Sequence, residues 1–122
     1  MPEHPLVGMW KLVSLDRTAP DGEVTHAEQP VGYLIYTNEG WFSEAFEYLN
    51  PADGSTAHVL YCGTWESPDA ATIIHQPHIH PNADLVGASL ERGFVVADNG
   101  NRFTLTASTG GGRAELVWER VR

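Results

Sequence analysis

The first strand-like stretch, residues 8–14, constrains the fold more than any other part of the chain. Side chains alternate along a strand, so Gly8 and Trp10 share a face, and the glycine leaves room for a large neighbour beside the indole. Residues 115–121 are also typical of a strand and carry Arg120. A guanidinium there can stack on Trp10 if the first and last strands are neighbours. Neighbouring ends would close the sheet.

Six further extended segments lie between these two, and turn-forming residues separate them. The predicted strands are residues 31–37, 41–48, 59–66, 72–76, 85–97 and 102–107, and no helix is predicted. Pro77 and Pro81 remove ladder donors, so regular pairing should falter after residue 76. Eight antiparallel strands linked by short turns form a sandwich or an up-and-down barrel, and the barrel can hold one small ligand. The Gly8-x-Trp10 start and the late Arg120 favour the all-β, eight-stranded antiparallel barrel.

Length, charge and cysteine content limit the classes of function. The 122 residues predict a single domain spanning 1–122. A net charge of -9, with Lys11 as the one lysine, argues against nucleic acid and anionic membranes as partners. Cys62 is the one cysteine, which excludes an internal disulfide, and the sequence shows neither a secretion signal nor an apolar run long enough to span a bilayer. We therefore expect an acidic cytoplasmic protein.

Several segments carry a resemblance to a known family. They are Gly8-x-Trp10-x-Leu12-Val13-Ser14, Val31-Gly32-Tyr33-Leu34-Ile35-Tyr36-Thr37, Tyr61-x-Gly63-Thr64-Trp65, His75 followed by Pro81-Asn82 and Gly87, Leu105-Thr106, and Leu116-Val117-Trp118-Glu119-Arg120. Together they resemble the bacterial lipocalin-like domain family, within the calycin barrels. The resemblance implies an up-and-down barrel with an internal pocket. The wider relatives include carriers, cyclases and isomerases, so the fold does not choose among these functions.

Two titratable residues are the odd polar members of apolar strand faces. Glu44 alternates with aromatic residues, and His75 shares its face with Ile73 and Ile79. If both point inward, burial raises the pKa of the carboxyl and lowers the pKa of the imidazole, whereas direct pairing opposes both shifts. Glu44 and His75 are therefore the candidate catalytic residues, or else the polar anchors of a ligand.

Each of these two residues also has a structural interpretation. For Glu44, the strand face is inverted, with Trp41 and Ala45 inside and the carboxylate in water. For His75, the imidazole is a neutral core residue held by one hydrogen bond. Alternation likewise does not decide which of Tyr33 and Tyr36 points inward.

The aromatic residues supply the candidate pocket lining. The predicted ligand-binding residues are Phe42, Phe46, Tyr61, Phe103 and Trp118. Ordinary core filling is the alternative, because side chains can fill a barrel of this size completely.

Other motifs point to less specific chemistry. His78 and His80 share a strand face and could bind zinc, nickel or copper, but a solvated rim explains them as well, so no metal and no cofactor are predicted. Cys62 has no activating neighbour in sequence and is expected to be a small buried or half-buried thiol.

Three functions from different classes remain. The first is binding of a small hydrophobic molecule in the barrel interior. The alternative is a cofactor-independent enzyme, a cyclase, isomerase or lyase, that acts on a small apolar substrate in the same pocket. The third is an interaction module in which outer aromatic residues form a partner surface, including a possible homodimer. The volume of the pocket separates the third from the other two.

Overall fold

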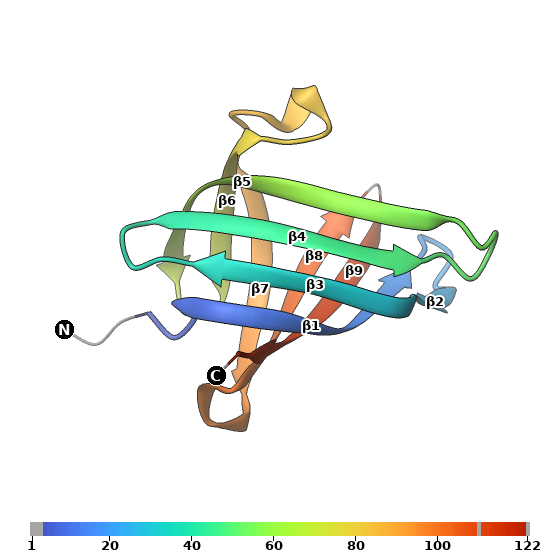
Figure 1. Ribbon diagram of the computed structural model, residues 1–122, viewed down its shortest axis with the longest axis horizontal. Helices are drawn as coiled ribbons and strands as arrows, with labels where there is room; N and C mark the ends of the chain where they lie inside the picture. The colour runs from blue at the N-terminus through green and yellow to red at the C-terminus, as the bar shows by residue number, and fades with distance from the viewer. Residues whose placement is uncertain (1–3, 110, 122) are drawn as a thin grey trace.

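The computed structural model describes residues 4–109 and 111–121, and in it one antiparallel sheet curls round on itself (Figure 1). The strands are β1 (Gly8–Thr18), β2 (Val24–His26), β3 (Glu28–Tyr36), β4 (Trp41–Leu49), β5 (Thr56–Asp69), β6 (Thr72–Ile79), β7 (Leu90–Ala97), β8 (Arg102–Thr109) and β9 (Gly112–Arg120). Two 3-10 turns, η1 (Ala83–Leu85) and η2 (Asp98–Gly100), are the helical elements among the described residues.

The strand order closes the sheet. From β3 to β9 each strand pairs with the next, β1 pairs with β3, and β9 returns to pair with β1. Counted over the described residues, the eight strands other than β2 form a closed up-and-down antiparallel barrel, as predicted. The short β2 was not predicted; it pairs with the last residues of β1, from Asp16 to Thr18.

Closure occurs where the sequence predicted it. Trp10 on β1 is directly opposite Arg120 on β9, whose guanidinium carbon lies 4.2 Å from the centre of the indole ring. The same guanidinium donates to the carbonyl oxygens of Val7 and Pro5 at 2.9 and 2.7 Å. A Cβ on Gly8 would lie 2.6 Å from Nη1 of Arg120, and the φ of Gly8 is +132°. Glycine is therefore required beside this contact.

The residues just before β1 plug this end of the barrel, which we call the closed end (residues 4–10, Phe103 and Arg120). Trp10 is fully buried, and its Nε1 donates to the carbonyl oxygen of Leu6 at 2.9 Å. Its ring meets Phe103 edge-on, with centroids 4.6 Å apart. The His4 ring packs against Trp65, with centroids 5.2 Å apart. The closed end thus buries the apolar surface of Trp10 and gives its indole N–H a hydrogen-bond acceptor.

Two irregularities change which side chains face inward. In β1 the register shifts between Leu12 and Ser14, so Ser14 does not continue the face of Trp10. Buried Leu15 and solvent-exposed Arg17 take over the inner side of the strand after the shift. A second shift lies between β5 and β6, where Gly63 pairs with Pro77 but the preceding Cys62 pairs with Ile79, so β6 has one extra residue. The extra residue of a bulge reverses the alternation that follows it.

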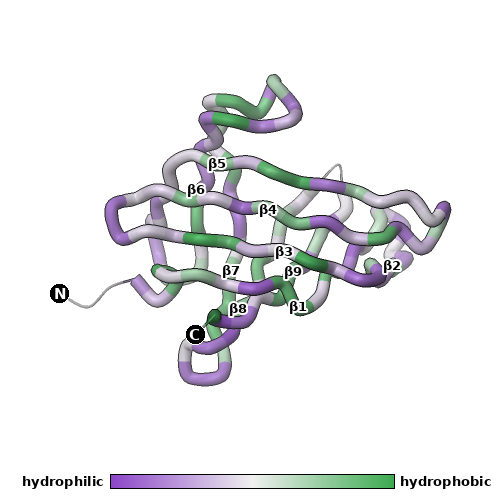
Figure 2. Tube along the Cα trace, viewed as in Figure 1, coloured by the Kyte–Doolittle hydropathy of each residue, from purple (hydrophilic) through white to green (hydrophobic). Residues whose placement is uncertain are grey.

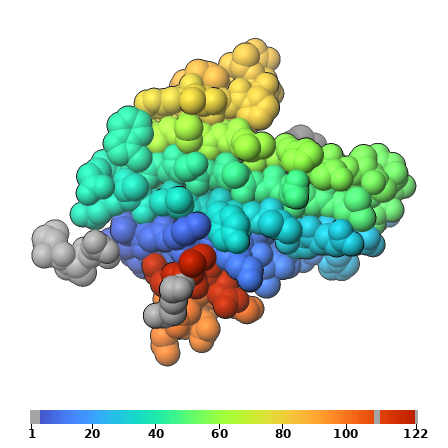
Figure 3. Space-filling view, viewed as in Figure 1, coloured from blue at the N-terminus to red at the C-terminus, as the bar shows by residue number. Residues whose placement is uncertain are grey.

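The second bulge corrects one prediction and supports another. Ile79 is 66% exposed, so grouping it with His75 on an inner face was wrong, and buried Pro77 takes that place. Pairing between β6 and β7 also ends at His75, as the prolines predicted. Residues between β6 and β7 stand out from the barrel, with η1 in them, so the predicted strand 85–97 begins only at Leu90 (Figure 3).

The core fills the barrel with aromatic and aliphatic side chains. In Figure 2 hydrophobic and hydrophilic residues alternate along the strands, while the turn between β7 and β8 is hydrophilic. Tyr36 is 1% exposed and Tyr33 is 46% exposed, which settles which tyrosine of β3 points inward. Over the described residues, no helix is long and apolar enough to cross a membrane.

Candidate functional site

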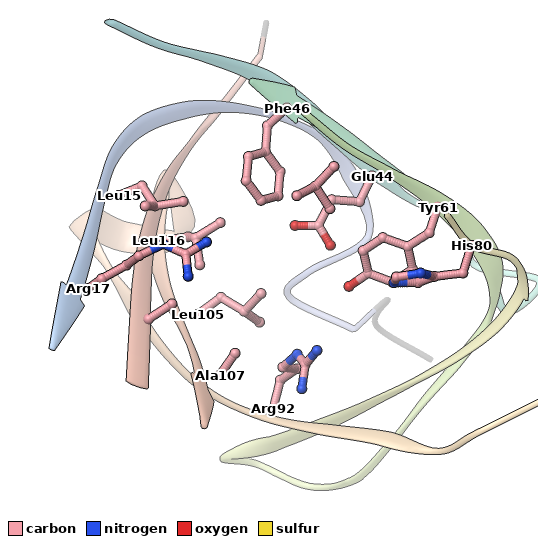
Figure 4. A pocket seen from close by; sticks show the side chains of 12 residues that line it. Leu15, Arg17, Glu44, Phe46, Tyr61, His80, Arg92, Leu105, Ala107 and Leu116 are labelled. Atoms are coloured by element: carbon pink, nitrogen blue, oxygen red, sulfur yellow. The ribbon is translucent and has the colours of Figure 1, made fainter. Parts of the chain in front are cut away.

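A cavity of about 210 Å³ occupies the half of the barrel away from Trp10. The direction of β1 shows this placement, because Trp10 lies near its start and cavity-lining Leu15 and Arg17 lie near its end. The lining is mostly apolar, with five polar or charged side chains in it (Figure 4). The lining residues are Leu15, Arg17, Glu44, Phe46, Val59, Tyr61, His80, Arg92, Leu105, Ala107, Ala114 and Leu116.

Glu44 is the one carboxylate in this lining. It lies on β4 directly opposite Tyr61 of β5, and it is 2% exposed, which confirms that it faces inward. The inverted face is excluded, since Trp41 is 53% exposed. Oε1 of Glu44 has no hydrogen-bond partner among the described residues. The nearest basic atom, Nδ1 of His75, is 4.0 Å from it, too far for a hydrogen bond.

His75 on β6 is fully buried and held on both ring nitrogens. Its Nε2 lies 2.7 Å from the hydroxyl of Tyr36, and its Nδ1 lies 2.9 Å from the hydroxyl of Tyr61. Phe42 stacks on the imidazole with ring centroids 4.3 Å apart. A neutral imidazole has one donor and one acceptor nitrogen, so one tyrosine donates to His75 and the other accepts from it. Tyr36, His75 and Tyr61 therefore form a hydrogen-bonded chain, and the Tyr61 hydroxyl also acts on the carboxyl of Glu44.

Burial decides the charge states in this chain. Desolvation raises the pKa of Glu44 to about 7, against the opposing effects of the Tyr61 hydroxyl and the positive charge of Arg92. Desolvation lowers the pKa of His75 to about 3, and the charge of Arg92 acts in the same direction. At neutral pH the imidazole is uncharged and Glu44 is partly protonated. Burial thus prevails over ion pairing in the competition that the sequence left open.

Two arginines complete the polar lining. Arg17, at the end of β1, donates from Nη2 to the hydroxyl of Tyr48 at 2.6 Å. Arg92 lies on the inner face of β7, and its Nη1 donates to the carbonyl of its neighbour Glu91 at 3.3 Å. Within the described part of the chain, neither guanidinium forms an ion pair with a carboxylate. The sequence reasoning missed both residues.

The two histidines after His75 separate. His80 lines the cavity, with its ring centroid 4.9 Å from that of Tyr61. His78 instead meets the ring of exposed Trp41 edge-on. The bulge therefore places them in different surroundings, contrary to the predicted shared face. The described residues contain no group of three or more His, Cys, Asp or Glu side chains that could hold a metal ion.

The predicted site residues fall into two groups. Glu44, Phe46 and Tyr61 line the cavity. The remaining predicted residues are buried in the core and are not part of this lining; they are Phe42, His75, Phe103 and Trp118. His75 still reaches the cavity chemistry through its contact with Tyr61. The roles of all seven residues stay predictions.

The missed residues had signals of different strength. Alternation along β7 puts Arg92 in step with buried Phe94, so its inward direction was readable. The direction of the Arg17 side chain could not be predicted, because the bulge between Leu12 and Ser14 reverses the alternation of side chains in the rest of β1.

Comparisons with known proteins agree with this architecture. Residues 7–59 match the family model described as the lipocalin-like domain, a span that covers β1 to β4 and the first residues of β5. A search of the curated proteins found no match. The family match and the closed up-and-down barrel together confirm the predicted resemblance to the lipocalin-like domain family.

Proposed function

We propose that the barrel interior binds a small, largely apolar molecule. The carrying observation is the cavity of about 210 Å³, which is lined mainly by leucine, valine, alanine and phenylalanine with a few polar groups among them. Ligand sites are typically apolar clefts in which a few polar groups set the orientation, and most exceed ~300 Å³. The expected ligand is therefore small. The acidic composition and single cysteine favour a cytoplasmic location for this activity.

The cavity also bears on the third hypothesis. A solidly filled barrel would have left only a role in protein interaction, and this barrel is not solidly filled. Exposed apolar side chains on the outer face of β3 and β5, Tyr33 and Leu60 among them, keep a homodimer as a secondary proposal.

One observation favours the enzyme alternative. Glu44 combines a pKa of about 7 with an unpartnered oxygen in a mostly apolar site, and a general base or acid works best with a pKa near the working pH. A cofactor-independent isomerase, cyclase or lyase would use Glu44 for proton transfer. The Tyr61 hydroxyl, positioned by neutral His75, would orient the reacting group of the substrate beside the carboxyl. Loss of turnover in Glu44→Gln, with ligand affinity retained, would identify this case.

Filling the cavity tests the binding proposal. Ala107 lines the cavity, and the adjacent Thr106 faces the outside of the same strand, β8. We expect wild type and Thr106→Phe to bind 2-naphthol in a fluorescence titration, and native mass spectrometry to show any co-purifying molecule on both. Ala107→Phe should lose both signals because the new ring occupies the cavity. Equal binding by all three proteins would place the ligand elsewhere and contradict the proposal.

A further inference from the structure

The cavity concentrates positive charge in a chain whose net charge is -9. Arg17 and Arg92 come from β1 and β7, and in Figure 4 both side chains are directed into the space that the lining encloses. Like charges in one lining repel each other, and an acidic protein has many carboxylates with which to neutralise them. Arg17 is solvent-exposed and Arg92 is half-buried, so both positive charges are accessible to an anion that enters the cavity.

Other arginines of the described chain are neutralised or fully used. Arg102 pairs with Glu119 at 3.2 Å, and Arg113 pairs with Glu115 at 3.1 Å. Arg120 donates to three backbone carbonyl groups and covers the indole of the closed end. Among the described arginines, Arg17 and Arg92 have neither a carboxylate partner nor a full set of backbone acceptors, and both line the cavity.

Both cavity guanidiniums are held with donors to spare. Arg17 is fixed by its hydrogen bond to Tyr48 and by its position 5.4 Å from the centre of that ring. Arg92 makes a long bond to a main-chain carbonyl of its own strand and also interacts with the Tyr61 hydroxyl. Most of their N–H groups have no partner among the described residues, and a planar guanidinium is suited to bind a carboxylate through two parallel hydrogen bonds.

The lone carboxylate of the lining does not cancel this charge. Glu44 is not within ion-pair distance of Arg17 or Arg92. Its pKa of about 7 also means that part of its negative charge is lost at neutral pH. An anion that enters the cavity thus meets two guanidiniums, the Tyr61 hydroxyl and a weakened negative charge.

We propose that the ligand is a small apolar carboxylic acid in its anionic form, with the carboxylate bound by Arg92 and Arg17 and the apolar body packed against the leucine-rich wall. This inference rests on the proposed binding function and names its ligand class. The cavity volume limits the body to about the size of one or two fused rings or a short chain.

Matched probe pairs test the charge of the ligand. The pairs are naphthalene-2-carboxylate with naphthalene-2-carboxamide, cinnamate with cinnamamide, and decanoate with decanamide, each titrated calorimetrically at pH 7.5. Members of a pair share shape and differ in charge. We expect at least one carboxylate to bind about ten-fold or more tightly than its amide, as charge-assisted hydrogen bonds exceed neutral ones by roughly that margin.

Variants assign the effect to the cavity. Arg92→Gln should lower carboxylate affinity about ten-fold and leave amide affinity nearly unchanged, Arg17→Gln should do the same to a smaller degree, and Arg92→Lys should be intermediate. Arg102→Gln removes a surface charge and is the control. Equal affinities within every pair, or equal effects of Arg92→Gln and Arg102→Gln, would overturn the anion inference while the binding proposal stands. Failure of all six probes to bind would overturn the binding proposal itself.

Discussion

The closed end and the cavity half of the barrel treat their polar groups in opposite ways. At the closed end, the indole N–H of Trp10 and the guanidinium of Arg120 both donate to backbone carbonyls. In the cavity half, Oε1 of Glu44 has no hydrogen-bond partner among the described residues, and the other such buried atom is Nε1 of Trp118 in the core. An unsatisfied buried polar atom costs stability, typically ~1–3 kcal/mol. The polar groups of Trp10 and Arg120 at the closed end therefore stabilise the fold, whereas the buried carboxyl of Glu44 persists at a cost, which is typical of a functional site.

Removal of the central side chain of the closed end should have the largest effect. Trp10 is fully buried against Phe103, so Trp10→Ala should lower the free energy of unfolding by about 3–5 kcal/mol through lost burial and the cavity that remains. Urea denaturation at pH 7 measures this loss. Trp41→Ala is the control, because Trp41 is exposed on the outer face. Similar small losses in both variants would show that the closed end is not the stabilising half.

Replacement of the buried carboxylate should stabilise the protein, with a dependence on pH. The pKa of Glu44 is raised from 4.5 to about 7, so the folded state holds more protons than the unfolded state between these values, and stability falls as pH rises through that window. Glu44→Gln removes this loss. The variant should gain up to about 3 kcal/mol over wild type at pH 8 and little at pH 4.5.

The neighbours of Glu44 sharpen this test. His75, with its pKa lowered to about 3, adds stability as pH rises from about 3 to 6.5, so the two groups nearly cancel between pH 4.5 and 6.5 in wild type. Tyr61 from β5 and Arg92 from β7 also act on the carboxyl. Urea denaturation at pH 4.5, 6 and 8 measures the profile. Glu66→Gln, at an exposed position of the neighbouring strand β5, should show no such trend. A flat difference for Glu44→Gln would contradict the raised pKa.

A smaller loss is expected from the second residue of the closed end. Arg120→Ala removes the contact with the indole, which is worth ~0.5–2 kcal/mol depending on its solvent exposure, together with three hydrogen bonds to carbonyls that water can partly replace. We expect a loss of about 2 kcal/mol by urea denaturation, below that of Trp10→Ala. Arg120→Lys should recover part of it, because the charge remains over the ring. No recovery in the lysine variant would assign the effect to the hydrogen bonds alone.

The parts of this molecule that were predictable from sequence are those with regular alternation. β4 runs from Trp41 to Leu49 without a register shift against β5, so the inward direction of Glu44 was readable as one of two options. The contact of Trp10 with Arg120 was readable because ring closure brings the chain ends together. Local pattern and global topology agreed at these positions.

The unpredictable parts depend on bulges and on packing across the barrel. One extra residue in β1 turned Arg17 inward, and the shift at Gly63 turned Ile79 outward. Alternation cannot signal either, since both residues lie beyond the irregularity. The existence of the cavity could not be predicted from the sequence either. Whether aromatic side chains fill a barrel depends on contacts between strands that are distant in sequence, and Phe103 and Trp118 went to the core rather than the cavity wall.

The smallest change in stability is expected from replacement of Arg92, the cavity arginine whose role differs most from that of Arg120 at the closed end. Arg92 makes a long hydrogen bond to its own strand, interacts with the Tyr61 hydroxyl and forms no ion pair among the described residues, so Arg92→Gln should change the free energy of unfolding at pH 7 by no more than about 1 kcal/mol. Its charge nevertheless acts on Glu44, whose pKa it lowers. The variant should therefore raise the pKa of Glu44, and with it the upper end of the pH window over which wild type loses stability. A carbon-detected NMR titration of the Glu44 carboxyl measures the shift directly, with Arg102→Gln as the control for a distant surface charge. A large loss of stability in Arg92→Gln would mean that this guanidinium supports the fold as Arg120 does. An unchanged pKa would mean that its charge does not reach the buried carboxyl, and the contrast between a stabilising end and a functional end would then lose its clearest residue.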